Sequence, residues 1–442
     1  MTFNLLMVAP RFAPVNTTGH YRTVKFVKYL REFDIEPTVV TLETDFASRW
    51  FGANIEYELL DDIPSDVEVV ELSCEEPRLP KSRFGKWLRQ QTKLNDNLGS
   101  VWRHSLLHGL ARLCEQKKFD GIYVSLPPFS LGTTIAAFAN ERGIPFIADF
   151  RDLWSEWCSN GRQSIIHQRL IERNERTVLH RAGLVVSVTE ECVERLQRKT
   201  TNSDTKFCHI PNGFDGILPK ELIAAQKSNI TIGYIGGFYY DPVQRRQSQT
   251  PWYKRRPHRW LYHYPAHEDW LYRSPYFFLK SLAELYQAEP KLRGCIHFEH
   301  IGRVPGWLDE MVDSFGLRDF VRFKGFCAKH DLPGLVKSWD WALATSEKVF
   351  DGPHYCLPSK IFDYLTFGLP ILGFVTHGAQ RRFIEAGNLG ICVDPDSHGA
   401  GVEVLASLLG NELKFETNAE FLDGYTRRSG ARKLAESCRA LV

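Results

Sequence analysis

Three polar residues lie close together in the stretch LPSKIFDYLTFGLPIL, which runs from Leu357 to Leu372. Ser359 and Lys360 precede an amphipathic run with helical spacing, and Asp363 stands in its first turn. Free backbone amides and the dipole at a helix N-terminus attract anions, and a lysine adds a point charge. A carboxylate in this place accepts hydrogen bonds from ribose hydroxyls in nucleotide sites. Alternatively, it only stabilises the helix by roughly 0.3–1 kcal/mol, and the sequence leaves both interpretations open.

A second charged cluster follows the predicted strand IPFIA. In DFRDLW, two acids, Asp149 and Asp152, bracket Arg151 at the end of that strand. An ion pair that closes the loop is one interpretation, and contact with a ligand is the other. The acids are spaced D-x-x-D, and the D-x-D pattern that holds a metal–nucleotide pair is missing. We therefore expect neither a metal nor a cofactor.

Two loops contain glycines that would let backbone amides approach a phosphate. The loop NTTGHYR carries Gly19, His20 and Arg22, and the segment GYIGGFYYD places Gly236 and Gly237 directly after an apolar run. Ordinary turns explain the glycines as well. The dinucleotide fingerprint G-x-G-x-x-G and the Walker A pattern are absent, which argues against a simple NAD enzyme and a P-loop NTPase.

A basic and aromatic segment extends over residues 240–275. Arginines and lysines alternate there with tryptophans and tyrosines, and five prolines interrupt the run. Such a composition stacks on sugar rings, lies at the interface of an anionic membrane, binds single-stranded nucleic acid, or forms a small core of its own. We expect contact with a glycan or lipid-linked acceptor, and we consider nucleic acid the least favoured partner.

Short apolar strands and amphipathic helical runs alternate twice along the chain, which predicts an α/β fold with two parallel sheets in tandem. We expect a first domain at 1–215, a linker at 216–228, a second domain at 229–420 that includes the basic aromatic insertion 240–275, and a last helix within 421–442. Ligands of such sheets bind beyond the carboxyl ends of the strands. The chemistry is therefore expected in the strand-to-helix loops.

Length and composition fit a globular protein of two domains. The chain has 442 residues, 43% hydrophobic and 24% charged, and a formal net charge of +2, so no global charge draws it to nucleic acid. No stretch reaches the roughly 18 apolar residues that a membrane span needs. Ten scattered cysteines without zinc spacing favour a reducing cytoplasm. We expect a cytoplasmic protein that contacts the inner face of the plasma membrane.

The order of these motifs resembles the GT-B-fold glycosyltransferases, in particular the retaining branch that includes bacterial polysaccharide and lipopolysaccharide sugar transferases. The resemblance covers nearly the whole chain and rests on NTTGHYR, DFRDLW, IPNGFD, GYIGG and PSKIFDYLTFGLPIL. It implies two Rossmann-like domains that face each other across a cleft. The second would hold a nucleotide-sugar donor, of UDP or GDP type, and the first would hold the acceptor. The C-terminal helix would cross back to the first domain.

The resemblance also implies roles for single residues around the transferred sugar. An acid at the position of Asp363 binds the donor ribose, and a glutamate eight positions earlier lies near the sugar. That earlier position is Tyr355 in this chain, and Asp351 or His354 would substitute for the missing carboxylate. The pair Arg151–Asp152 stands where the family often has His-Asp near the sugar.

The donor's phosphates and base are assigned in the same way. A basic residue after the Gly-Gly loop reaches the pyrophosphate in the family, and Arg273 is the best match, with Lys360 as the second candidate. A base pocket is expected around Gly302–Arg303 and Phe323–Phe326. The resemblance therefore names Arg151, Asp152 and Asp363 as catalytic, and Gly19, His20, Arg22, Gly236, Gly237, Arg273, Arg303, Tyr355, Ser359 and Lys360 as nucleotide-sugar-binding.

These observations predict a glycosyltransferase that moves a sugar from a nucleotide donor to a glycan or lipid-linked acceptor in surface polysaccharide synthesis, with retention and without metal. Arginine, lysine and helix amides would stabilise the charge on the leaving nucleoside diphosphate. Two alternatives stay open. A nucleotide-sugar epimerase of the same fold needs no acceptor groove, and a non-catalytic binding protein would account for the missing glutamate.

Overall fold

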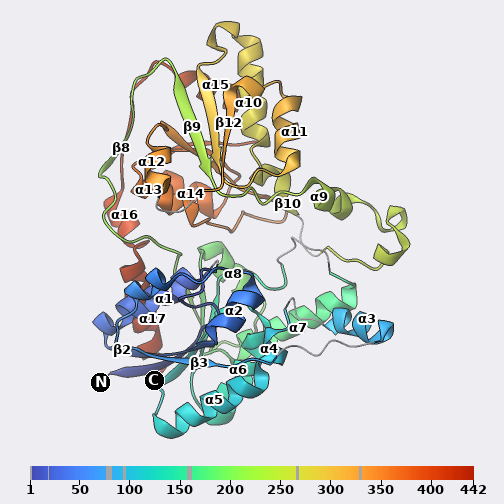
Figure 1. Cartoon of the computed structure of the whole chain (residues 1–442), viewed down its shortest axis with the longest axis vertical. Helices are drawn as coiled ribbons and strands as arrows, with labels where there is room; N and C mark the ends of the chain where they lie inside the picture. The colour runs from blue at the N-terminus through green and yellow to red at the C-terminus, as the bar shows by residue number, and fades with distance from the viewer. Residues whose placement is uncertain are drawn as a thin grey trace. The chain divides into compact units, whose positions relative to one another are not determined.

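The computed structural model describes residues 2–17, 19–75, 82–92, 96–156, 162–264, 268–327 and 331–442. These residues group into two units (Figure 1). The first unit comprises Met1–Asn212, Trp252–Ala266 and Tyr425–Val442, and the second comprises Gly213–Pro251 and His267–Gly424. The prediction assigned all of 240–275 to the second domain, whereas the structure groups the middle of this insertion with the first unit.

A parallel sheet of seven strands forms the centre of the first unit, in the order β3-β2-β1-β4-β5-β6-β7. Its strands are β1 (Phe3–Val8), β2 (Ile35–Leu42), β3 (Glu68–Leu72), β4 (Gly121–Leu126), β5 (Phe146–Phe150), β6 (Leu184–Ser187) and β7 (Lys206–His209). The strands of the middle of the sheet are buried along their whole length, as expected where helices cover both faces. The strand order reverses between β1 and β4, and ligands of such sheets bind at this point.

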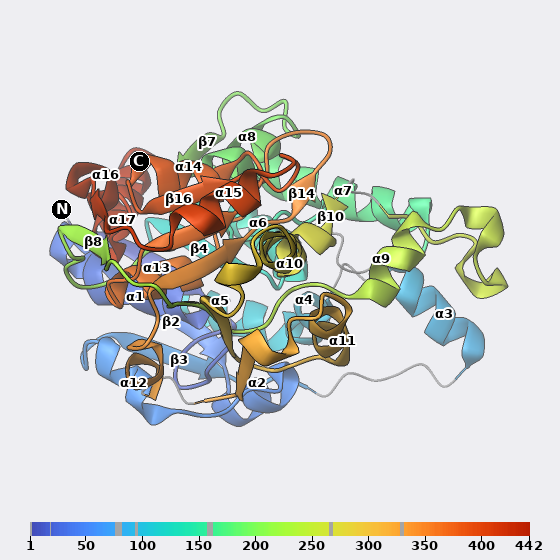
Figure 2. The ribbon, with the colours of Figure 1, turned by 90° about the horizontal axis from the view of Figure 1, so that it is seen from above.

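Helices connect these strands as the alternation in the sequence predicts. They are α1 (His20–Leu30), α2 (Thr44–Phe51), α3 (Arg83–Thr92), α4 (Leu98–Val101), α5 (Arg103–Gln116), α6 (Ser130–Arg142), α7 (Ile165–Arg181) and α8 (Glu190–Gln197). The C-terminal helix α17 (Arg427–Arg439) packs against α1, and both are seen side by side in Figures 1 and 2. Its apolar stripe, which includes Ala431, Leu434 and Cys438, joins the core of the first unit. The predicted return of this helix to the first domain is confirmed.

The second unit repeats the architecture with a parallel sheet of six strands in the order β12-β11-β9-β13-β15-β16. They are β9 (Ile230–Ile235), β11 (Ile296–Ile301), β12 (Val321–Gly325), β13 (Trp341–Thr345), β15 (Ile371–Phe374) and β16 (Gly390–Val393). The order reverses between β9 and β13, as it does between β1 and β4 in the first unit. Both sheets confirm the predicted fold of two Rossmann-like domains.

The part of the chain that the structure describes contains eight α-helices in the second unit. They are α9 (Pro242–Gln249), α10 (Tyr276–Ala288), α11 (Gly306–Ser314), α12 (Leu332–Val336), α13 (Lys360–Thr366), α14 (Ala379–Ala386), α15 (Ala400–Ser407) and α16 (Ala419–Asp423). One core cluster lies under α10, α11 and α15. A second cluster on another side of the sheet includes Val336 of α12 and Tyr364 of α13. The start of α13 is therefore fixed against the sheet by buried side chains.

Two short antiparallel pairs complete the second unit. Strand β8 (Glu221–Ala224) pairs with β17 (Leu413–Glu416), and β10 (Glu268–Asp269) pairs with β14 (Lys348–Val349). Strand β8 falls inside the segment 216–228, for which a linker is predicted. Its alternating burial, with Leu222 and Ala224 inside, explains why composition alone did not reveal it. Among the described residues, no helix is both long and apolar enough to cross a bilayer.

Candidate functional site

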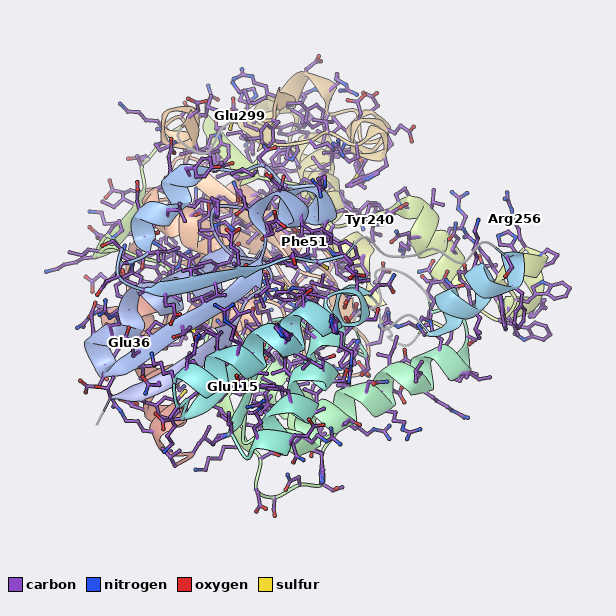
Figure 3. The ribbon with its side chains drawn as sticks, turned by 60° about the horizontal axis from the view of Figure 1, so that its bottom comes forward. Glu36, Phe51, Glu115, Tyr240, Arg256 and Glu299 are labelled. Carbon is purple, nitrogen blue, oxygen red and sulfur yellow. The ribbon has the colours of Figure 1, made fainter. Side chains whose placement is uncertain are left out.

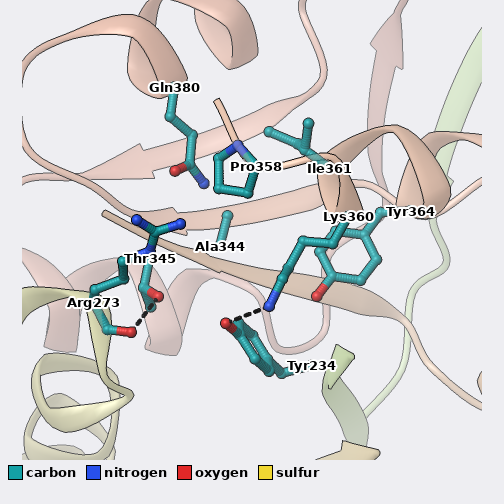
Figure 4. Close-up of a pocket in the computed structure, with 9 residues that line it drawn as sticks. All are labelled: Tyr234, Arg273, Ala344, Thr345, Pro358, Lys360, Ile361, Tyr364 and Gln380. Carbon is teal, nitrogen blue, oxygen red and sulfur yellow. Dashed lines mark hydrogen bonds between the residues drawn. The ribbon is translucent and has the colours of Figure 1, made fainter. Parts of the chain in front are cut away.

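A narrow pocket opens where the strand order of the second sheet reverses, at the carboxyl ends of β9 and β13 (Figure 4). It is lined by Tyr234, Arg273, Ala344, Thr345, Pro358, Lys360, Ile361, Tyr364 and Gln380. Its enclosed volume of ≈ 10 Å³ has room for about one water molecule. A larger ligand would therefore meet the two cations of this pocket at its mouth rather than inside it.

Lys360 supplies the first of these cations. Its Nζ atom donates a hydrogen bond to Tyr234 Oη at 2.6 Å and lies 4.0 Å from the centroid of the same ring. A weaker contact of 3.4 Å joins Nζ to the carbonyl oxygen of Gly237. Burial, with a further contribution from the charge of Arg273, lowers the pKa of Lys360 to about 7. The amine of Lys360 is therefore only partly protonated near neutral pH. A bound anion would raise its pKa and favour the charged form.

Arg273 supplies the second cation and is fixed from several sides. Its side chain is buried, forms a 3.1 Å ion pair with Glu347 and lies over the rings of Tyr239 and Trp270, at 4.8 and 5.3 Å from their centroids. Its main-chain carbonyl accepts a hydrogen bond from Thr345 Oγ1 at 3.1 Å. These contacts fix the guanidinium before any ligand arrives, which reduces the entropy lost on binding.

Glu347 is a functional residue that the sequence reasoning missed. It follows β13 by two residues, is buried, and lies 3.1 Å from Arg273 and 3.4 Å from His354 Nδ1. Burial alone would raise the pKa of Glu347, but the charge of Arg273, followed by His354, outweighs it and lowers the pKa to about 2. An acid just beyond a buried strand was the available signal. The carboxylate compensates Arg273 and thereby positions it.

The residues expected around the donor sugar occupy different environments. His354 is buried, with the backbone nitrogen of Cys356 3.3 Å from its Nδ1 atom and that of Gln380 3.3 Å from its Nε2 atom. Because a neutral imidazole has one acceptor nitrogen, only one of these two contacts is a hydrogen bond in a given tautomer. Tyr355 donates a hydrogen bond to Glu268, and Asp351 is exposed. Of the two proposed substitutes for the missing glutamate, His354 is therefore the one that is buried beside Glu347, whereas Asp351 is exposed.

The first turn of α13 carries Asp363, the acid predicted to bind the donor ribose. Asp363 is half-buried and interacts electrostatically with Lys360. Ser359 is the N-cap residue, but its side chain makes no capping hydrogen bond. With seven residues, α13 has a small dipole, so the charge of Lys360 outweighs the helix N-terminus as an attraction for anions.

The glycine loop after β9 brings backbone close to Lys360. Gly236 has φ +87°, and a Cβ atom added to it would lie 3.5 Å from Lys360 Nζ. Its amide donates to the carbonyl of Ile301 at 2.7 Å, and its carbonyl accepts from His300 Nε2 at 2.8 Å. A side chain at Gly302 would collide with the Gly236 carbonyl at 2.8 Å. The two loops therefore need glycine to approach each other.

The predicted base pocket is open where the structure describes it. Arg303 and Phe326 are exposed, the latter to 89%, and Phe323 packs partly against the core. Among the described residues, no group of three or more His, Cys, Asp or Glu side chains is arranged to hold a metal ion.

Arg22 of the first unit forms a buried ion pair. Its Nε and Nη2 atoms donate to the two carboxylate oxygens of Asp149 at 2.7 and 3.0 Å, and Nη1 donates to the carbonyl of Pro211 at 3.1 Å. Tyr123 Oη donates to the same carboxylate at 2.5 Å. This network ties α1 to β4 and β5. The guanidinium of Arg22 is thus held in a buried ion pair with Asp149, and the contact with a nucleotide sugar stays a prediction.

Gly19 and Arg151 meet at the switch point of the first sheet. Gly19 has φ +101°, and a Cβ atom there would lie 1.3 Å from Nη1 of Arg151. The Nη2 atom of Arg151 donates to the carbonyl of Pro127 at 2.5 Å, and burial lowers the pKa of this arginine. His20 is buried with Nδ1 2.7 Å from the carbonyl of Thr17, whereas Asp152 is exposed. The structure therefore brings together Gly19 and Arg151, which the sequence placed in separate motifs.

Comparisons with known proteins agree with this architecture. Residues 18–213 match the model of the family described as "Glycosyl transferase 4-like domain", and no curated protein matches the chain. The chain is similar to the apo form of the lipopolysaccharide outer core galactosyltransferase WaaB, at 9% identity, with 100% of both chains covered and a TM-score of 0.57. It is also similar to sucrose-phosphate synthase from Thermosynechococcus elongatus, at 11% identity, 99% and 94% coverage and a TM-score of 0.54.

A third similar structure contains a nucleotide. The Anabaena protein HepE in complex with UDP is 14% identical, with 100% of this chain and 97% of that chain covered and a TM-score of 0.51. At such identities the likeness to these three structures shows the fold.

Proposed function

We propose that this chain transfers a sugar from a UDP-sugar to a glycan or lipid-linked acceptor in surface polysaccharide synthesis. The match of residues 18–213 to a glycosyl transferase 4-like domain and the similarity in fold to WaaB support this proposal. The observation that carries this proposal is the pair of cations, Lys360 and Arg273, at the switch point of the second sheet. The preference for UDP is supported by HepE, which holds UDP in a structure of similar fold.

The proposed chemistry follows from the charge that develops as the glycosidic bond breaks. The leaving nucleoside diphosphate gains negative charge, and fixed cations stabilise it without reorganisation. Lys360 gains a proton as the anion binds, and Arg273 is held in place by Glu347. We assign Asp363 to the ribose hydroxyls. With two cations in this position, the reaction needs no metal, and the leaving phosphate accepts the proton of the acceptor hydroxyl with retention at the anomeric carbon.

We assign the first unit to the acceptor, with Arg151 and Asp152 near the reacting hydroxyl. The similarity to WaaB, a lipopolysaccharide outer core galactosyltransferase, supports an acceptor of the cell-surface glycan class. A lipid-linked acceptor would place the enzyme at the cytoplasmic face of the plasma membrane. Arg151 adds positive charge at this position, which suits an acidic sugar or a phosphate group on the substrate.

A panel of UDP- and GDP-sugars tests the proposal. Purified protein is incubated with each donor, and release of nucleotide is followed with and without an extract of surface glycan acceptors and with and without EDTA. We expect slow hydrolysis of one donor, faster turnover with acceptor, no effect of EDTA, and a product with the anomeric configuration of the donor by NMR.

Substitutions locate the activity. Lys360→Met and Asp363→Asn should each weaken donor binding about tenfold or more. The control is Lys348→Met, at a partly exposed lysine of the same unit that is paired with Asp396, and it should bind the donor normally. Binding of no donor, or equal binding by all these variants, would contradict the proposal. Interconversion of the donor sugar without any transfer would instead indicate the epimerase.

A further inference from the structure

The first unit carries a surface on which exposed apolar and basic side chains are combined. It consists of helix α3, the segment 162–171, which includes the start of α7, and the insertion segment 252–264. We name it the basic apolar surface. Helices α3 and α7 contact each other. The backbone of Arg162 is bridged to His263 by hydrogen bonds of 2.6 and 3.0 Å, which attaches the insertion segment to the start of α7.

Large apolar side chains are exposed on all three elements. On α3, Phe84, Trp87 and Leu88 have the spacing that places side chains on one face of a helix, and Phe84 is 69% exposed. At the start of α7, Ile165 and Ile166 are exposed, the latter to 74%. The insertion segment adds Trp252, Tyr253, Trp260 and Leu261. Large exposed apolar side chains on neighbouring elements mark an interaction surface, because soluble proteins rarely leave large apolar patches uncovered.

The insertion segment is folded by its own contacts rather than by burial of these rings. Arg255 donates to the carbonyl of Tyr262 at 2.5 Å and lies 5.1 Å from the ring centroid of Tyr264. Trp260 Nε1 donates to the carbonyl of Arg255 at 2.8 Å. The guanidinium of Arg255 therefore stabilises the fold of the segment itself, while Lys254 and Arg256 are exposed. Figure 3 shows Arg256 at the outer end of the segment.

The charge of this surface has one sign. Segments 82–92, 162–171 and 252–264 together contain nine lysines and arginines and no aspartate or glutamate. The rest of the chain has more acidic than basic residues, since the whole chain is only +2. Lys86, Arg169, Lys254 and Arg256 are exposed, whereas Arg162 is buried. These exposed cations lie in segments without any acidic residue, while the rest of the chain is net acidic, so the partner of this surface should be an anion.

We propose that the basic apolar surface binds the surface of an anionic lipid bilayer. Tryptophan and tyrosine favour the membrane–water interface, lysine and arginine are attracted to anionic headgroups, and leucine and isoleucine gain by leaving water for the acyl boundary. The aliphatic side chains decide against the other partners, because stacking on bases or sugar rings uses aromatic faces and needs no exposed Ile166 or Leu261.

This inference builds on the proposed function, because a lipid-linked acceptor is found in a bilayer. Its test needs neither donor nor acceptor, so its failure is distinct from a failure of the proposed activity. Full-length protein is sedimented with vesicles of phosphatidylcholine alone and of phosphatidylcholine mixed with phosphatidylglycerol. We expect binding to the mixed vesicles to be about tenfold tighter or more, and to weaken as NaCl is raised.

Two independent variants and a matched control locate the binding. Lys254→Glu with Arg256→Glu should weaken binding about tenfold or more, and Trp87→Ser with Trp252→Ser should weaken it at every salt concentration. The control is Lys118→Glu with Lys291→Glu, which reverses two exposed charges elsewhere and should bind as the unchanged protein does. Equal binding to neutral and anionic vesicles would overturn the proposal, as would normal binding by both variants. Tighter binding to a single-stranded oligonucleotide than to the vesicles would overturn it as well.

Discussion

Because of Lys360, the affinity for the donor should decrease as pH rises through neutrality. With its pKa lowered to about 7, the amine is about 90% protonated at pH 6 and about 10% at pH 8. A diphosphate diester stays ionised over this range and binds the ammonium form. The affinity for a UDP-sugar should therefore fall about tenfold between pH 6 and pH 8, because the protein must first take up a proton.

Isothermal titration calorimetry measures both the affinity and the proton. At pH 8 the heat of binding should depend on the ionisation enthalpy of the buffer, with an uptake of nearly one proton per donor bound. Lys360→Met should bind weakly at pH 6 and lose the pH dependence, and Lys360→Arg, which stays charged throughout, should bind without it. The same tenfold fall in Lys360→Met, or no fall in the unchanged protein, would refute the reasoning.

Further predictions concern the groups that position the two arginines. Glu347→Gln leaves Arg273 buried without its counter-charge and should lower the free energy of unfolding in urea by about 3–5 kcal/mol at pH 7. Because the folded pKa of this acid is about 2 and the unfolded pKa is about 4.3, its contribution is present above about pH 4.3 and is lost as pH falls toward 2. The difference between variant and parent should shrink over that window, and a constant difference would contradict the assignment. Gly19→Ala would collide with Arg151 and should abolish transfer while donor affinity is kept. Gly52→Ala, with φ +61° and open space, should cost only about 1–2 kcal/mol and leave transfer unchanged; loss of transfer in both variants would argue against a specific role for Arg151.

The sequence predicts the sheets well because their strands are local signals. Runs such as IPFIADF and ITIGYI are short, apolar and bounded by turns, and they form β5 and β9. Pairings between distant segments leave no such signal. The partner of β8 is β17, nearly two hundred residues later, and the insertion pairs with the first unit at Arg162 and His263, about one hundred residues apart in the sequence.

In the candidate site too, residues with a local signal could be predicted, whereas contacts between distant segments could not. Lys360 and Gly236 could be named from their loops, because a switch point brings the loops after β9 and β13 together. Glu347 also lies just beyond β13, but its role depends on Arg273, which lies far away in the sequence, so its position alone did not distinguish it from other loop acids. Arg22 was placed at the ligand because of its charge, whereas its environment is set by Asp149 on another strand.

The central claim is that the cations Lys360 and Arg273 receive the diphosphate of a nucleotide-sugar. A crystal structure of the protein with UDP tests it most directly. The account predicts phosphate oxygens within hydrogen-bonding distance of Lys360 Nζ and the Arg273 guanidinium, with the ribose at Asp363. UDP bound elsewhere, or a pocket whose cations do not contact the phosphates, would contradict it.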